Sequence, residues 1–196
     1  MSSAPPILTI GHSRHPLARF IELLEGAGAT AVADVRSAPV SRFSPHFNKQ
    51  ALAASLAAQG IAYVFLGREL GGRPGRPEMY TQGVADYEKM AASPEFRAGL
   101  ARLREAAEQH RVAMMCAEAD PLDCHRCLLI GRALAEQGSE VRHILASADI
   151  ITQAEVEDLL LGLAGLAEPG LLPASRAERL AEAYRARNRI AAYYKS

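Results

Sequence analysis

Short apolar runs alternate with longer helical patterns along most of the chain, and this alternation constrains the fold more than any other feature of the sequence. Five runs predict β-strands, at residues 7–10, 31–35, 61–65, 112–115 and 140–145. The segments between and after them carry apolar residues at helical spacing, at residues 17–26, 49–59, 84–91, 94–110, 123–137 and 153–163. This order predicts an α/β fold: a mainly parallel, five-stranded sheet with right-handed crossovers and helices on both faces.

Two segments do not follow the alternation. Residues 66–82 are rich in Gly, Arg and Pro, and a long connection of this kind tends to be functional or mobile. Residues 168–173 read as a Pro/Gly linker, and residues 175–194 as a basic amphipathic helix. We therefore predict an α/β domain over residues 1–165, followed at residues 166–196 by a linker and a C-terminal helix. We expect that helix to dock on its own domain or on the partner in a homodimer, with nucleic-acid binding as the alternative.

The charge balance and the cysteine content limit the classes of protein. The 22 Lys and Arg residues equal the 22 Asp and Glu residues, so net charge does not direct the whole chain toward nucleic acid or acidic membranes. Three cysteines in 196 residues do not make a disulfide scaffold, and we expect reduced thiols. No segment has the pattern of a signal peptide or a membrane span. We expect a cytoplasmic protein with no membrane partner.

The densest group of chemically useful side chains is MCAEADPLDCHRC, residues 115–127, at the exit of the fourth predicted strand. Polar groups also follow the first two strands, with His12 and Ser13 after one and Asp34, Arg36 and Ser37 after the other. Because ligands of parallel sheets bind outside the carboxyl ends of the strands, these segments predict one shared site at that edge.

Two alternatives are open for the residues that follow the second strand. Asp34 ends an apolar strand, where burial of a carboxylate is costly unless it is paired. Arg36 is the nearest partner, and such a pair would either hold the loop or position Arg36 for an anionic ligand. Arg42 lies further along the same polar loop and is a second candidate anion ligand. His12 is either part of the site or a hydrogen-bonded histidine that orders its loop.

The cysteine turn is open to several chemistries. Cys124, His125 and Arg126 fall near the predicted start of a helix, where free N–H groups and the helix dipole favour an anion and lower the pKa of a thiol. Cys124 is thus a candidate nucleophile, with Cys116 as a second thiol across the turn. The alternative is that the cysteines are small buried hydrophobic residues, which we favour for Cys127. A Cys-x5-Arg phosphatase loop is not present, because its arginine position falls on Leu122 or Ile130.

A metal site is the remaining interpretation of these residues. Thiolate and imidazole ligands are available in principle from Cys116, Cys124, Cys127, His125 and His12. However, the single CxxC has no second ligand pair downstream, and His125 lies between its two cysteines. We therefore expect no metal.

The motifs taken together resemble the DUF488 family, a domain of unknown function. The resemblance is carried by TIGHS at residues 9–13, DVRSAPVSRFSPHFN at 34–48, LGRELGG at 66–72, MCAEADPLDCHR at 115–126 and EVRHI at 140–144. It implies an α/β domain with a parallel sheet but no particular reaction. The family pattern marks His12, Ser13, Asp34, Arg36, Ser37, Arg42, Glu118, Cys124, His125 and Arg126, whereas Cys127 and the tail beyond about residue 165 fall outside it.

These residues support an enzyme, a hydrolase or transferase, that acts on a small anionic or nucleotide-like substrate at the C-terminal edge of the sheet. Asp34 or Glu118 would serve as general base and His12 or His125 as acid partner, with Cys124 as nucleophile in a covalent variant. Ser13, Arg36, Ser37, Arg42 and Arg126 would bind the anion. The alternatives are a non-catalytic module that binds a nucleotide or nucleic acid, and a Cys/His metal-binding protein. The cofactor stays unknown.

Overall fold

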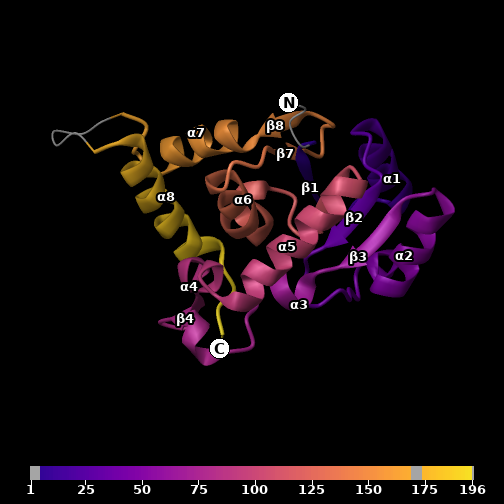
Figure 1. Cartoon of the computed structure of the whole chain (residues 1–196), viewed down its shortest axis with the longest axis horizontal. Coiled ribbons are helices and arrows are strands. Elements are labelled where there is room, and N and C mark those ends of the chain that lie inside the picture. Colours follow the sequence, from indigo (N-terminus) through magenta and orange to yellow (C-terminus); the bar gives the residue numbers. More distant parts are fainter. Residues whose placement is uncertain (1–4, 169–173, 196) are drawn as a thin grey trace.

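The computed structural model describes residues 5–168 and 174–195, and its centre is a six-stranded sheet in the order β3-β2-β6-β1-β7-β8 (Figure 1). The strands are β1 (Ile7–Gly11), β2 (Ala31–Asp34), β3 (Ala62–Phe65), β6 (Val112–Cys116), β7 (Val141–Ile144) and β8 (Ile150–Thr152). Neighbouring strands are parallel except β8, which runs antiparallel to β7. The mainly parallel sheet is confirmed, but the count of five strands is wrong: β8 is a three-residue edge strand, too short to leave a periodic signal.

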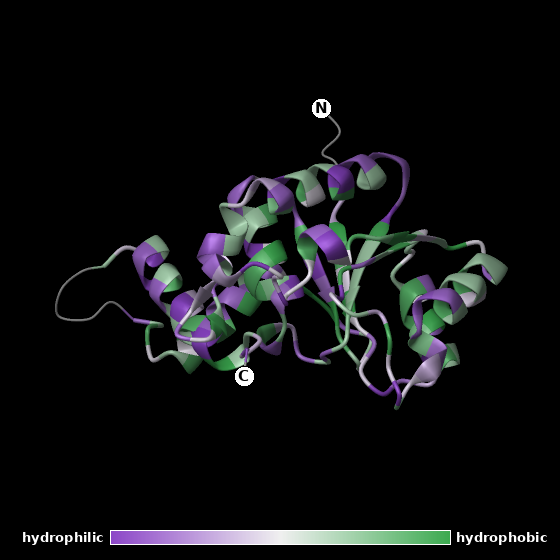
Figure 2. Ribbon diagram, turned by 90° about the horizontal axis from the view of Figure 1, so that it is seen from below, coloured by the Kyte–Doolittle hydropathy of each residue, from purple (hydrophilic) through white to green (hydrophobic). Residues whose placement is uncertain are grey.

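Both faces of the sheet are covered by helices, as predicted (Figures 1 and 2). One face packs against α1 (Leu17–Gly26) and α2 (Lys49–Ala58). The other packs against α5 (Pro94–Gln109), residues 126–136 and α7 (Gln153–Leu163). Helix α8 (Arg176–Ala191) joins the same core by packing on α7 and on residues 121–131 rather than on the sheet. Side chains alternate along the central strand β6, so that Ala113 and Met115 join the first core and Val112, Met114 and Cys116 join the second. The alternation places Cys116 on the face that α5 and residues 126–136 cover.

The Gly/Arg/Pro-rich stretch, residues 66–82, contains short helices and a short strand, although no regular element was predicted there. It contains α3 (Gly67–Leu70), the 3₁₀ turn η2 (Pro77–Met79) and β4 (Tyr80–Thr81), which pairs with β5 (Val84–Ala85) in a two-stranded antiparallel sheet. The predicted helix at residues 84–91 is therefore wrong in its first turn. Helix α4 (Tyr87–Ala91) begins only after Asp86, whose carboxylate accepts hydrogen bonds from the amides of Glu88 and Lys89.

The segment after β6 is divided where one helix was predicted. It forms the 3₁₀ turn η3 (Pro121–Asp123), the π-helix η4 (Arg126–Gly131) and α6 (Arg132–Glu136). A shorter 3₁₀ turn, η1 (Pro45–Phe47), lies in the loop after β2. Single π-helical segments are rare overall and are frequent at functional sites, and this one begins directly after Cys124 and His125.

The C-terminal helix α8 packs on its own chain, against α7, η3 and η4 (Figure 1). Ser175 and Glu178 form a capping box at its start. The side chain of Asn188 accepts from the amide of Tyr87 and donates to the carbonyl of Ala85. After α8, Tyr194 pairs with Val84 as an antiparallel bridge. These contacts bring the C-terminal end of the described chain beside β4 and β5.

Across the described residues, no helix has both the length and the apolar character that a membrane crossing requires.

Candidate functional site

A pocket of about 210 Å³ opens at the carboxyl edge of the sheet, and segments far apart in the sequence form its wall. The lining residues follow β2, β3 and β6 or lie in α4 and at the end of α8. They are Arg36, Ser37, Ala38, Gly72, Arg73, Tyr87, Cys116, Ala117, Glu118, Asp123, His125, Ala191 and Tyr193. The pocket therefore lies at the edge of the sheet where the sequence predicted a site, and Ala191 and Tyr193 of the C-terminal segment contribute to its wall.

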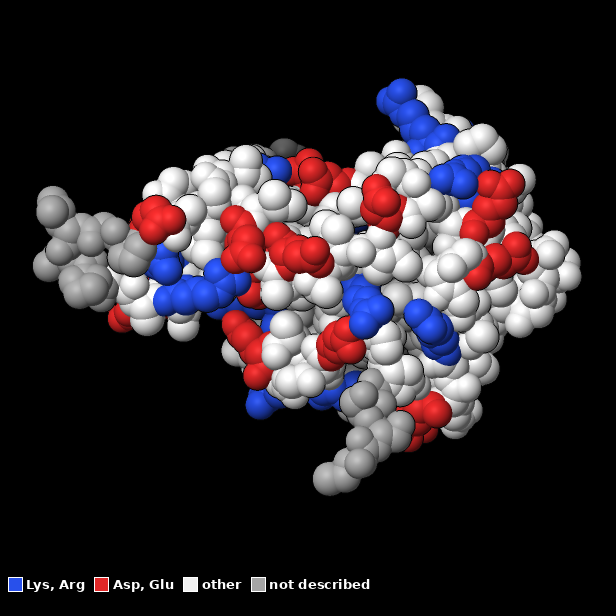
Figure 3. Space-filling model, turned by 90° about the horizontal axis from the view of Figure 1, so that it is seen from above, with Lys and Arg blue, Asp and Glu red and all other residues white. Residues whose placement is uncertain are grey.

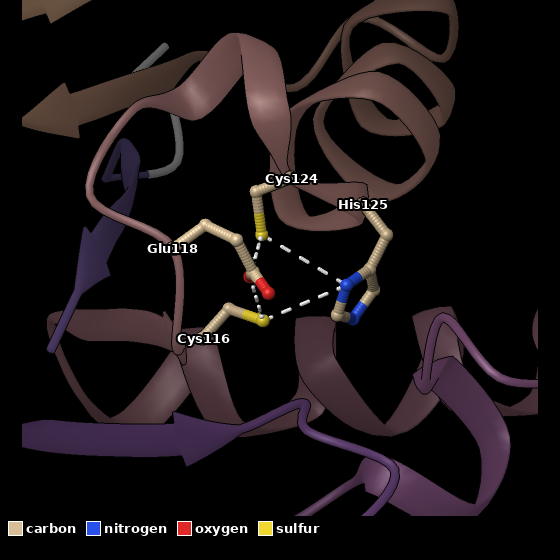
Figure 4. Close-up of side chains that lie close together, drawn as sticks. All are labelled: Cys116, Glu118, Cys124 and His125. Atoms are coloured by element: carbon tan, nitrogen blue, oxygen red, sulfur yellow. Dashed lines mark hydrogen bonds between the residues drawn. The ribbon is translucent and has the colours of Figure 1, made fainter. Parts of the chain in front are cut away.

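Four side chains in and behind this wall converge on one point, and we call them the thiol cluster: Cys116, Glu118, Cys124 and His125 (Figure 4). Oε2 of Glu118 lies 3.0 Å from the Sγ of each cysteine. Nδ1 of His125 lies 3.5 Å from the Sγ of Cys116 and 3.8 Å from that of Cys124. All four donor atoms lie within 4.8 Å of one another.

The backbone that carries Glu118 is held from two sides. Gly11, at the end of β1, lies so close that an added Cβ would be 1.8 Å from the carbonyl oxygen of Glu118. The guanidinium of Arg126 donates to that same carbonyl at 2.6 Å and to the carbonyl of Ala119 at 2.8 Å. Arg126 is fully buried, so in this arrangement its guanidinium supports the turn. The anion-binding role expected for it stays a prediction.

The ring of His125 is fixed with one nitrogen facing the thiols. Nε2 lies 2.9 Å from the carbonyl oxygen of Val35 and donates to it, so Nδ1 presents a lone pair to the cysteines in the neutral ring. Gly72 packs against the ring, since a Cβ at that position would be 2.8 Å from His125 Cγ. Burial lowers the pKa of His125, but Cys124, the Val35 carbonyl and the charge of Glu118 together outweigh it, so the net pKa lies above the ordinary value.

The two thiols of the cluster differ in acidity. Burial raises the pKa of Cys116 well above its ordinary value, and Cys124 and Glu118 raise it further. Burial acts the same way on Cys124, but the hydrogen bond from Cys116 and the charges of Arg126 and His125 outweigh it and hold the pKa of Cys124 well below its ordinary value. Burial, followed by Cys124, raises the pKa of Glu118. The cluster therefore favours one thiolate, that of Cys124, and ionisation of Cys116 as well would require further positive charge nearby.

Asp34, Arg36, His12 and Tyr63 form a second group, which we call the arginine network. The Asp34 carboxylate is fully buried and accepts from the amide, Nε and Nη2 of Arg36, the last at 2.6 Å, and from the Tyr63 hydroxyl. Nη1 of Arg36 donates to Nε2 of His12 at 3.2 Å. Burial, with the Arg36 charge, lowers the pKa of His12 to about 4. The ion pair between Asp34 and Arg36, one of the alternatives that the sequence left open, is present. Arg36 lines the pocket, whereas Asp34 and His12 are not among its lining residues.

The remaining predicted residues divide between the pocket and its surroundings. Ser37 lines the pocket, and its Oγ accepts from the amide of Arg73. Ser13 has a positive φ of 45° and donates its amide to Ala117, which orders the turn beside the pocket. Arg42 is exposed and is not part of the pocket lining. Cys127 points away from the thiol cluster, toward the side chain of Gln153.

Sequence reasoning did not find Arg73 or Tyr193. The guanidinium of Arg73 lies 4.9 Å from the centre of the Tyr193 ring, a cation–π contact between two residues that line the pocket. The unusual composition of residues 66–82 was the available signal for Arg73. Nothing in a basic amphipathic tail indicated that its end would line the site.

The arrangement has three chemical capacities. Glu118 and His125 can move protons at the pocket wall, the thiol cluster can supply soft ligands to a metal ion, and Arg73 with Ser37 can donate to an anion.

Comparisons with known proteins agree with the motifs but name no reaction. The model of a family described as a domain of unknown function, DUF488, matches residues 16–133, which is more than half of the chain. The matched part runs from the start of α1 into α6 and includes the thiol cluster, whereas β1, β7, β8, α7 and α8 lie outside it. No curated protein and no solved structure matches the chain. The chain belongs to the DUF488 family.

Proposed function

We propose that the protein is an enzyme, a hydrolase or a transferase, that acts on a small anionic or nucleotide-like substrate in the pocket at the carboxyl edge of the sheet. The observation that carries the proposal is the shared pocket wall of Arg73, Glu118 and His125. It combines a cation for an anionic group with two side chains that exchange protons, and a purely structural network does not need to open onto a pocket.

Each lining residue has a role that its contacts support. Arg73 is exposed, and among the described residues its side chain makes a cation–π contact with the Tyr193 ring and no hydrogen bond or ion pair, so its N–H donors can turn toward an anionic group. The hydroxyl of Ser37 can donate to the same group. Glu118 acts as the general base, because its raised pKa is closer to neutrality than that of an ordinary carboxyl. His125 lies beside Glu118 in the same cluster, and its Nδ1 faces the two thiols that contact the Glu118 carboxylate.

The covalent variant, in which Cys124 attacks the substrate, has less support. Cys124 is 1% exposed and is not a lining residue, whereas Cys116 and Glu118 are. A nucleophile must approach its target within about 3–3.5 Å, and Cys124 lies behind the wall. Glu118 as base, acting on water or on a substrate hydroxyl, requires no such approach by sulfur.

The pocket volume limits the substrate. Typical ligand pockets measure about 300–1,000 Å³, so about 210 Å³ suits a small molecule or one end of a larger one.

The alternative of nucleic-acid binding through the C-terminal helix is not supported by the contacts of its arginines. Four arginines of α8 contact acids or carbonyls of the same chain: Arg176, Arg179, Arg185 and Arg187. The face seen in Figure 3 likewise mixes basic and acidic side chains without a continuous basic patch.

The anion site is tested with inorganic phosphate as the probe, by calorimetric titration of the full chain. Arg73→Gln should weaken phosphate binding about tenfold to a hundredfold, because it removes a charge-assisted hydrogen bond. Arg42→Gln is the matched control, since this arginine is exposed and lies outside the pocket. Absent phosphate binding, or equal losses in the two variants, would contradict the anion site.

Turnover is tested separately, by incubating the protein with phosphate esters and nucleosides and following their cleavage or group transfer by mass spectrometry. Glu118→Gln should abolish turnover and leave phosphate affinity within about twofold, since Glu118 is not assigned to the anion. Full turnover in the Glu118→Gln variant would remove the general base from the proposal.

A further inference from the structure

The spacing of the thiol cluster fits a tetrahedral metal site. A tetrahedral zinc ion with Zn–S bonds of about 2.3 Å and Zn–N bonds of about 2.0 Å separates its sulfur and nitrogen ligands by about 3.5 Å. The separations between His125 Nδ1 and the two sulfur atoms are 3.5 Å and 3.8 Å. Oε2 of Glu118 is closer to both sulfurs, at 3.0 Å. Glu118 would therefore retreat by about half an ångström to act as a fourth ligand.

The surroundings of the cluster are those of metal ligands. A ligating histidine ordinarily donates its second ring N–H to a carbonyl or carboxylate, which fixes the ring and its tautomer. His125 does so through Nε2, at 2.9 Å from the carbonyl of Val35, with Gly72 packed against the ring. The backbone amide of Arg126 points at the Sγ of Cys124 at 3.5 Å, a contact that stabilises a thiolate.

The charges of the buried residues also match a divalent cation. Two thiolates, one carboxylate and a doubly charged ion have a net charge of minus one. The guanidinium of Arg126 is fully buried directly behind the cluster and supplies the compensating positive charge. Its Nε has no hydrogen-bond partner within the described part of the chain. Without a cation, two adjacent buried thiolates would repel each other and the carboxylate.

We propose that Cys116, Glu118, Cys124 and His125 bind one zinc ion at the wall of the pocket. Two thiolates and an imidazole in tetrahedral arrangement select zinc over magnesium or calcium, which prefer oxygen ligands. Binding releases the thiol protons to solvent, and the ion enters from the pocket, which Cys116, Glu118 and His125 line.

The zinc ion would lie where the proposed substrate binds. Any role of the ion in turnover rests on the proposed function, whereas the binding of zinc itself is independent of that function. Glu118 is the ligand most able to leave, because the residue as a whole is exposed although its carboxylate points into the cluster, whereas the other three residues are buried. Its departure would open a fourth position toward the pocket for water or for a substrate oxygen. Sites with three protein ligands and one exchangeable position are the catalytic form of zinc site.

The test measures metal binding in the reduced full-length protein. The protein is stripped with a chelator, and zinc stoichiometry and affinity are determined by competition with a chromophoric chelator. Cobalt(II) serves as the spectroscopic substitute, since thiolate ligation gives charge-transfer absorption and tetrahedral geometry gives intense visible bands. We expect one ion per chain and both spectral signatures. Failure of the reduced wild-type protein to bind, or an octahedral cobalt spectrum without thiolate bands, overturns the proposal.

Variants assign the ligands. Cys116→Ser and Cys124→Ser should each lower zinc affinity by more than about a hundredfold, since loss of even an outer-shell partner costs about 10–100-fold. Cys127→Ser is the matched control: its thiol is equally buried but contacts Gln153 instead of the cluster, and it should bind zinc as the wild type does. Equal losses in all three serine variants would overturn the assignment.

Glu118→Gln provides a further variant that alters an exposed residue and is expected to fold normally. The variant should keep the tetrahedral cobalt spectrum but bind metal more weakly, as expected when an exchangeable ligand is weakened. An unchanged affinity would remove Glu118 from the site.

The zinc result is independent of the proposed function. Stoichiometric zinc with neither phosphate binding nor turnover leaves the metal site standing and refutes the enzyme. Turnover by the metal-free protein refutes a catalytic ion and leaves the enzyme standing.

Discussion

Protonation of His143 is expected to destabilise the protein below neutral pH. The His143 ring lies in β7 and is fully buried. Nε2 donates to Gln153 Oε1 at 2.9 Å, and Nδ1 accepts from the Thr9 hydroxyl at 2.8 Å, so the neutral ring is satisfied on both sides. Burial lowers the pKa of His143 to about 4, and although Gln153 opposes this effect, the charge of Arg126 adds to it.

The sign and the size of the effect follow from linkage. The folded-state pKa of about 4 is lower than the 6.5 of an unperturbed histidine, so the unfolded chain takes up the proton first as the pH falls. The stability is fully present above about pH 6.5 and decreases toward about pH 4. The free energy of unfolding should fall by about 2 kcal/mol between pH 7 and pH 5, and by about 3 kcal/mol near pH 4.

The assay is urea unfolding near pH 7 and near pH 5, for the wild type and for His143→Gln. A glutamine can donate to Gln153 and accept from Thr9 but does not titrate, so the variant should lose about 2 kcal/mol less over this interval. Contributions from His12 and from the carboxyl groups are common to both proteins and cancel in the comparison. Equal losses in the two proteins, or a pKa of His143 near 6.5 by NMR titration of the wild type, would refute the reasoning.

Two further substitutions test the site geometry. Asp34→Asn should lower the free energy of unfolding by about 3–5 kcal/mol, because it leaves the buried Arg36 charge without its partner; a loss below about 1 kcal/mol in urea unfolding would contradict a buried ion pair. Gly72→Ala should weaken zinc binding about tenfold, because a Cβ there would be 2.8 Å from the His125 ring and would displace it. Gly75→Ala, with open space around the added Cβ, is the control and should leave the affinity unchanged.

The parts of the fold that were predictable from sequence are those with a strong local signal. The runs that became β1, β2 and β6 are buried along their length and show as continuous apolar segments. Their shared direction placed the residues that follow them at one edge, and the pocket is found there. The pairing of Asp34 with Arg36 was also open to prediction, because a carboxylate at the end of a buried strand requires a nearby partner.

Other parts depend on tertiary contacts that no local pattern reports. Arg126 has the same formal charge as Arg42, yet one is buried behind the thiol cluster and the other is exposed outside the pocket. The metal-site interpretation of the sequence looked for a second ligand pair to match the CxxC. In the fold, Cys127 leaves the cluster, and Cys116 joins Cys124 from the end of a separate strand. The four residues fall at positions 116, 118, 124 and 125, a spacing that differs from the paired-ligand pattern for which the sequence was searched.

Because the C-terminal tail lines the pocket, the reactive groups and part of the pocket wall come from different parts of the chain. The donors that would carry out the chemistry lie within the part of the chain that the family model matches, whereas Tyr193 and Ala191, which also line the pocket, lie well beyond it. Replacing or removing this last segment would thus alter the admission of ligands without touching a reactive atom. If the proposed function holds, two DUF488 proteins with the same reactive groups and different tails would then differ in the ligands that they bind.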